Sequence, residues 1–303
     1  MKQTMCSRVR AYLEQRRALG YKLRIEGQML LNFARYADRS GHRGPLTRKL
    51  ALCWAALPSQ ATPLYRARRL EVVRVFARHQ AASEPATEIP PRHVFGPAHC
   101  RRTPHVYSPS QILQILGRAA RLPGRLRPVT YKTLLGLLAC TGLRISEALA
   151  LEVGDVDLVQ GQILIRESKY HHSRWVPLHP TALAPLRHYD RRRRRLFPKA
   201  QHFFVSDRGQ QFAYTTVRTT FRHLARELKS TGVRPQVRLH DLRHTFACRV
   251  LLHWQRTQRG ATGRVVILSR YLGHLRVSDT YWYLTAVPEL LQEAARHCES
   301  PCL

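Results

Sequence analysis

The chain has 303 residues, enough for two domains that each bury a core of their own. It carries 51 Lys and Arg against 19 Asp and Glu, a net charge of +32, and 44% of its residues are hydrophobic, a globular composition that excludes a disordered basic tail. Its longest apolar runs, 50–57 and 134–143, are too short to cross a bilayer, so no membrane partner is expected.

The surplus of positive charge indicates a polyanionic partner. Only seven of the basic residues are Lys, and the guanidinium of Arg binds phosphate oxygens two at a time, so we expect a nucleic-acid backbone. A generally basic protein, such as a ribosomal one, is the alternative. The seven Cys form no Cys-x-x-Cys pair and indicate reduced thiols in a cytoplasmic, nucleoid-associated protein. With no Gly-rich phosphate loop and only one terminal His–Cys group, at 297–302, we expect no cofactor and no metal.

Residues 1–82 show the apolar periodicity of four helices. Gly20 stops the first, Thr47 can cap a short third one, and Thr62-Pro63 opens a longer fourth one. The fourth helix carries arginines beside its apolar stripe, which either lie along DNA or form a solvated face. We therefore predict a helical domain over 1–82.

A linker and a larger domain follow. Residues 83–107 are rich in proline and lack an apolar period, which is typical of a linker. Residues 108–303 alternate helices with one β-hairpin, whose strands lead up to Ile165 and away from Trp175 around a basic turn. The predicted fold class is mainly α with a small β-hairpin or sheet (α+β).

Several arginines are candidates for contact with a phosphate backbone. A run of five, 191–195, ends a predicted helix that begins near Thr181, and a solvated helix end is the alternative. The candidate set, taken from this run, the fourth helix and the hairpin, is Arg66, Arg69, Arg74, Arg174, Arg191 and Arg192.

Four separated segments hold residues that could act together on a phosphodiester. Attack by a protein hydroxyl needs a nucleophile, stabilisation of charge on the non-bridging oxygens, and a proton for the leaving oxygen. Each residue alone is ordinary, but the set supplies all three: Arg144, Lys169, His240, Arg243, His274 and Tyr283. Positive neighbours favour the anion of a tyrosine, so arginines that hold a phosphate would also activate the attacking hydroxyl.

The order Arg, Lys, His-x-x-Arg, His, Tyr resembles the catalytic set of the tyrosine recombinases, also called the phage integrase family. The strings Thr-Gly-Leu-Arg-Ile-Ser-Glu at 141–147, His-Asp-Leu-Arg-His at 240–244 and Leu-Gly-His at 272–274 carry the resemblance, with Arg-Trp-Val-Pro-Leu after the hairpin turn. It covers about 108–285. It implies a four-helix core-binding domain that clamps DNA over 1–82 and a catalytic domain over 108–303.

The resemblance also implies the covalent chemistry. Tyr283 would attack the scissile phosphate and form a 3′-phosphotyrosyl link, with Tyr281 as the rival nucleophile. Lys169 would protonate the leaving 5′-oxygen. The link conserves bond energy, so strands rejoin without ATP or metal.

The remaining roles concern the phosphate. By resemblance, Arg144 and Arg243 would hold its non-bridging oxygens, His274 would assist them, and His240 would support proton transfer. Glu147 either orients Arg144 or caps a helix.

The implied function is site-specific recombination of two double-stranded DNA sites, for integration, excision or transposition of a mobile element. A tail helix at 288–298 would dock on a neighbouring protomer in a homotetramer, with folding back on its own domain as the alternative. Accessory or sister recombinases would be further partners. The stretch 253–264 reads as an enlarged loop. The alternatives are a non-cleaving DNA-binding subunit of a multi-recombinase system and a type IB topoisomerase.

Overall fold

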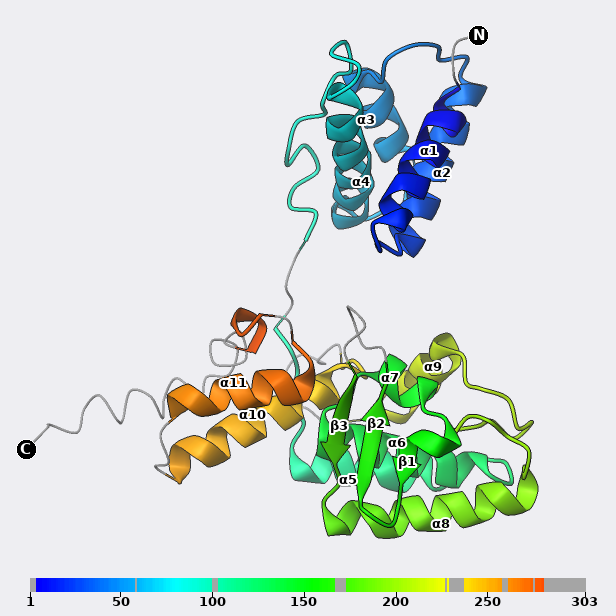
Figure 1. Cartoon of the computed structure of the whole chain (residues 1–303), viewed down its shortest axis with the longest axis vertical. Helices are drawn as coiled ribbons and strands as arrows, with labels where there is room; N and C mark the ends of the chain where they lie inside the picture. The colour runs from blue at the N-terminus through cyan, green and yellow to red at the C-terminus, as the bar shows by residue number, and fades with distance from the viewer. Residues whose placement is uncertain are drawn as a thin grey trace, which may run out of the picture. The chain divides into compact units, whose positions relative to one another are not determined.

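The computed structural model divides the chain into two compact units, Met1–Arg102 and Thr103–Leu303 (Figure 1). None of the helices it describes is long and apolar enough to span a membrane. The residues described are 4–57, 59–99, 103–166, 173–226, 228, 237–257, 261–274 and 276–280.

The first unit contains the four predicted helices. Threonines open three of them, because the side chains of Thr4, Thr47 and Thr62 each accept a hydrogen bond from the backbone N–H three residues on. The apolar stripes meet in one core, where the rings of Phe33 and Trp54 pack edge to face at 5.4 Å. The helices are α1 (Met5–Ala18), α2 (Arg24–Arg39), α3 (Arg48–Ala56) and α4 (Pro63–Ala81).

Residues of the predicted linker are bonded to both units. Glu88 pairs its backbone N–H with the carbonyl of Leu46 at 2.8 Å, and Phe95 packs against the core of the first unit. Tyr107 is buried in the second unit, where its backbone N–H donates to Thr245 Oγ1 at 2.9 Å.

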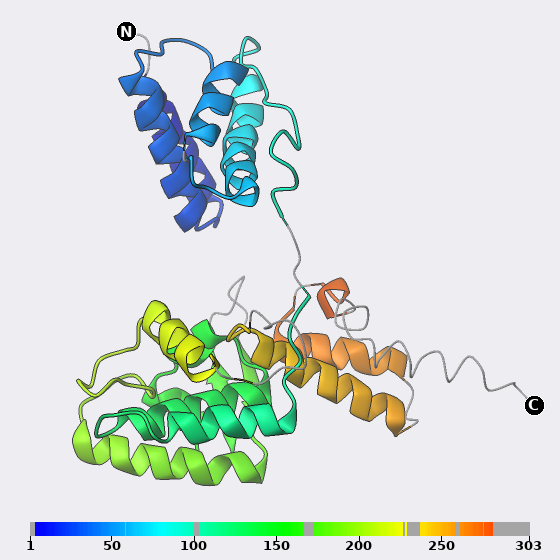
Figure 2. The ribbon, with the colours of Figure 1, turned by 180° about the vertical axis from the view of Figure 1, so that it is seen from behind.

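The second unit is mostly helical with a small sheet, as the sequence predicts. Helix α6 lies at its centre and contacts α5, α8 and α10. Helices α10 and α11 lie side by side in both views (Figures 1 and 2) and share a smaller core. The helices are α5 (Pro109–Ala119), α6 (Arg127–Thr141), α7 (Ile145–Ala150), α8 (Pro180–Leu196), α9 (Tyr214–Leu224), α10 (Asp241–Arg256) and α11 (Ala261–Leu272), with a short 3-10 turn η1 (Val153–Asp155).

The predicted hairpin is present as β2 (Gln162–Ile165) paired antiparallel with β3 (Arg174–Pro177). Its inward side chains, among them Ile163 and Val176, join the main core. A two-residue strand that the sequence did not indicate, β1 (Val156–Asp157), pairs with β2 and completes the order β1-β2-β3.

Two expectations about loops and helix ends need correction. The stretch 253–264 is not an enlarged loop among the described residues, because α10 continues to Arg256 and α11 begins at Ala261. The run 191–195 is not uniformly solvated. Arg193 is 1% exposed and pairs with buried Asp190 at 2.8 Å, since the helix turns one side of the run into the core.

Candidate active site

The first element of the site is the junction between α6 and α7. Helix α6 ends at Gly142, whose φ of +64° is the left-handed conformation that favours glycine. A Cβ there would meet the ring of Phe246 at 2.5 Å, so the position also needs the small residue for space. This tight end places Arg144 at the start of α7, where its backbone N–H donates to Glu147 Oε2 at 3.0 Å.

Two guanidinium groups are fixed by carbonyls of one turn. Arg243, on the first turn of α10 and 2% exposed, donates to the carbonyl of Gly142 at 2.8 Å and to that of Leu272 at 2.7 Å. Arg144 Nη2 donates to the carbonyl of Gly273 at 2.9 Å. Adjacent carbonyls at the end of α11 therefore hold both arginines.

Glu147 joins Arg144 to the hairpin. Its carboxylate accepts from Arg144 Nη1 at 2.8 Å and from both terminal nitrogens of Arg174, at 3.2 and 2.9 Å. Burial alone would raise the pKa of Glu147, but hydrogen bonds and charge from Arg174 and Arg144 outweigh it, so its pKa lies below the usual value. The carboxylate is ionised and orients both guanidinium groups.

Three histidines lie beside the guanidinium groups. The rings of His240 and His244 meet edge to face at 4.8 Å, and His274 Nδ1 is 2.8 Å from the hydroxyl of buried Thr280. Desolvation first, and the charge of Arg243 second, lower the pKa of His240 and of His274 to about 4. His240 is the more exposed of the two, yet its pKa is also lowered, because desolvation and the neighbouring arginines both disfavour its protonated form. Both rings are neutral at pH 7 and can each donate one N–H.

The structure thus brings together four of the six residues of the predicted catalytic set: Arg144, Arg243, His240 and His274. The charges of both arginines act on both histidines. Lys169, Tyr283 and the rival Tyr281 lie outside the described residues, as does the tail at 288–298.

The arginines expected to contact DNA have varied surroundings. Arg69 stacks over the ring of Trp54 at 3.7 Å, and Arg66 donates to the carbonyl of Ser59 at 2.8 Å. Arg74 donates to the carbonyl of Pro90.

On α8, Arg191 and Arg192 are exposed, and Arg192 donates to the carbonyl of Arg125 at 3.1 Å. Arg174 is instead part of the site described above.

Sequence reasoning gave no role to His244 or Thr280. The spacing of four residues between His240 and His244 on one helix was a usable signal for the first. Nothing local pointed to Thr280, because its partner is reached only through the turn after α11.

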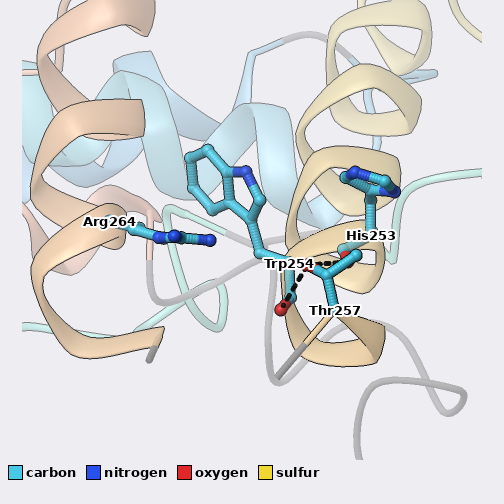
Figure 3. A pocket seen from close by; sticks show the side chains of 4 residues that line it. All are labelled: His253, Trp254, Thr257 and Arg264. Carbon is cyan, nitrogen blue, oxygen red and sulfur yellow. Dashed lines mark hydrogen bonds between the residues drawn. The ribbon is translucent and has the colours of Figure 1, made fainter. Parts of the chain in front are cut away.

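A hollow lies at the far end of α10, away from Arg243 on its first turn. It is lined by His253, Trp254, Thr257 and Arg264 (Figure 3). At a rise of 1.5 Å per residue its near edge is roughly 15 Å along the helix from Arg243. Nowhere in the described part of the chain do three or more His, Cys, Asp or Glu side chains gather as a metal site would need.

Comparison with known proteins decides the family. The model of the phage integrase family matches residues 106–289, a range that includes all six residues of the catalytic set. The chain belongs to the phage integrase family, the tyrosine recombinases. A Sinorhizobium fredii protein, provisionally named integrase/recombinase y4rB, is 40% identical over 96% of both chains. Tyrosine recombinase XerD of Shewanella oneidensis is 32% identical, over 75% of this chain and 72% of its own length.

Solved structures of the family share the fold. The Tn1549 transposon integrase in complex with transposon right end DNA superposes with a TM-score of 0.68 at 14% identity, covering 93% of this chain and 94% of its own. XerH recombinase bound to its difH substrate gives 0.65 at 17% identity, covering 89% and 78%. At this identity the likeness concerns the fold alone.

Proposed function

We propose that this tyrosine recombinase cleaves and rejoins DNA strands at specific sites through a 3′-phosphotyrosyl intermediate, for integration, excision or transposition of a mobile element. The observation that carries the proposal is the pair of guanidinium groups, Arg144 and Arg243, fixed beside two neutral histidines. Fixed donors of this kind stabilise the charge that grows on a phosphate under attack. The family and the DNA named in the titles of the solved relatives support it.

In the first step the hydroxyl oxygen of Tyr283 attacks phosphorus, and the bond from phosphorus to the 5′-oxygen breaks. Lys169 gives the leaving oxygen its proton, while His240 supports removal of the proton from the tyrosine. Arg144, Arg243 and the N–H of His274 hold the non-bridging oxygens. Attack by a partner strand's 5′-hydroxyl reverses these steps, restores the tyrosine and needs neither ATP nor metal.

DNA is held by the positive surface of the protein. We propose that exposed arginines such as Arg191 and Arg192, and Arg66, Arg69 and Arg74 of the first unit, contribute to backbone binding. Two DNA sites would be joined in a tetramer coupled by the tail at 288–298. A lambda integrase tetramer bound to a Holliday junction, with a TM-score of 0.59, is a precedent within the shared fold.

A nicked suicide substrate tests the chemistry, because the cut fragment diffuses away and traps the covalent adduct. The wild-type protein should form an adduct that survives denaturing electrophoresis, with EDTA present. Tyr283→Phe should bind DNA with unchanged affinity and form none, and Tyr281→Phe should behave as wild type. An adduct in the Tyr283→Phe variant would reassign the nucleophile, and no adduct in the wild type would refute the proposed reaction.

A further inference from the structure

Arg174 is surrounded by protein partners and reaches two other segments of the second unit, α7 and the end of α11. It begins β3, five residues after Lys169 in the sequence. Its Nε donates to the carbonyl of Tyr271 at 2.8 Å, and its terminal nitrogens donate to the carboxylate of Glu147 at 3.2 and 2.9 Å. The side chains of Arg174 and Glu147 are only 14% and 7% exposed.

The hydrogen bonds of this guanidinium fix its position in the protein. Each of its three nitrogens already donates to an oxygen of the protein, and its charge faces an ionised carboxylate. A bidentate pair that is largely buried is fixed in geometry and is costly to break. These bonds use three of the five N–H groups of Arg174, and the side chain could not move onto a phosphate without breaking them.

The backbone around Arg174 is shaped to admit it. Gly273 has a φ of +69°, and a Cβ there would lie 2.8 Å from Arg174 Nη1 and 3.4 Å from Arg144 Nη1. The turn that supplies carbonyls to Arg144 and Arg243 therefore passes directly against the guanidinium of Arg174. Through Glu147 on one side and this turn on the other, Arg174 contacts both supports of Arg144.

We propose that Arg174 is a positioning residue of the cleavage reaction, which holds Arg144 in place through Glu147 and the turn at 271–273, and that it is not a DNA-backbone ligand. The inference rests on the proposed function, since it assigns a support to a side chain that acts on the scissile phosphate. The assignment replaces the expectation that Arg174 contacts DNA.

Binding and cleavage separate the two roles. Arg174→Gln should lower the single-turnover cleavage rate about 10- to 100-fold on the suicide substrate. The slope of log Kd against log salt should stay unchanged. A backbone ligand would behave differently, because losing one phosphate contact reduces the magnitude of that slope by about 0.9. A reduced slope with an unchanged cleavage rate would overturn the proposal.

A neutral substrate tests whether Arg174 acts through Arg144. Replacing one non-bridging oxygen by methyl removes the phosphate charge, so the reaction depends less on cationic stabilisation. The loss caused by Arg174→Gln should therefore shrink on the methylphosphonate at least tenfold, as should the loss caused by Arg144→Ala. An equal loss on both substrates would mean a merely structural role and would overturn the proposal.

Matched variants guard against misfolding. Arg166, directly after β2, is exposed and pairs with Asp155 rather than with Glu147, so Arg166→Gln should leave the cleavage rate unchanged. Arg174→Lys keeps the charge but not the bidentate pair, and should lose nearly as much rate as Arg174→Gln with a smaller effect on folding. Glu147→Gln combined with Arg174→Gln should be no slower than the worse single variant, and additive losses would refute the coupling.

The controls also keep the two proposals apart. If the wild type forms no adduct, the proposed function fails. If the wild type forms the adduct at full rate and Arg174→Gln and Arg174→Lys do the same, the proposed function stands and only the role of Arg174 fails.

Discussion

Replacing Gly273 by alanine tests how tightly the site is packed. Gly161 is a matched control in the same unit, because both glycines have a φ of +69°. The left-handed backbone costs an alanine about 1–2 kcal/mol at either position. At Gly161 the new Cβ would meet Leu183 at 3.4 Å and the carbonyl of Leu178 at 3.8 Å, which are ordinary contacts, so Gly161→Ala should lose no more than this amount.

Gly273→Ala should lose more, because its Cβ would lie 2.8 Å from Arg174 Nη1. A guanidinium at the end of a flexible side chain could move aside, but Glu147 and the carbonyl of Tyr271 hold this one. Giving up one charge-assisted hydrogen bond costs about 1.5–3 kcal/mol. We expect the unfolding free energy of Gly273→Ala to fall below that of Gly161→Ala by about this amount.

Urea unfolding followed by circular dichroism measures both variants, and the suicide substrate reports cleavage in parallel. Gly161→Ala should cleave as the wild type does, whereas Gly273→Ala should cleave at least tenfold more slowly. Equal unfolding free energies for the two variants, or normal cleavage by Gly273→Ala, would show that the turn can yield without disturbing Arg174 and would refute the packing argument.

Three further predictions follow from the described contacts. Thr280→Val removes the hydroxyl that bonds His274 Nδ1 and should slow cleavage about tenfold, whereas Thr280→Ser should cleave normally, and equal rates would exclude a role for this bond. Desolvation and the charges of the arginines lower the pKa of His274 to about 4. Between pH 6.5 and 4 this histidine is therefore protonated in the unfolded chain but neutral in the folded one. The free energy of unfolding should fall as the pH falls through this range, by up to about 1.4 kcal/mol per pH unit for this group. His274→Gln should make urea midpoints measured across that range less steep, and an unchanged slope would contradict the assignment. Arg193→Met leaves buried Asp190 paired only with the exposed Arg194 and should lower the free energy of unfolding by about 3 kcal/mol in urea. The exposed Arg191→Met should lower it by less than about 0.5 kcal/mol. A similar loss for both variants would show that Arg193 is not a core residue.

Local signals in the sequence were enough for most of the fold. The apolar stripes and the threonine caps at Thr47 and Thr62 predicted helices that the structure contains. The alternation before and after the basic turn predicted the pairing of β2 with β3. These features depend on neighbours a few residues away, which is the range over which spacing carries information.

Long-range partners were beyond that reach. Strand β1 has only two residues and no alternation to reveal it. Glu147 and Arg174 are 27 residues apart in the sequence, so neither position indicates its partner. The run 191–195 presents five like charges with no apolar period, and only the packing of α8 shows that Arg193 faces inward.

The carbonyls of Leu272 and Gly273 are consecutive; the first accepts from Arg243 and the second from Arg144. The two carbonyls belong to adjacent peptide units that share the Cα of Gly273, so this one residue links the positions of the two guanidinium groups. A displacement of Gly273 would therefore move both carbonyls, and a substitution at 272 or 273 acts on the two arginines together. A variant meant to perturb one of these arginines alone is therefore better made at that arginine than in the turn at 272–273.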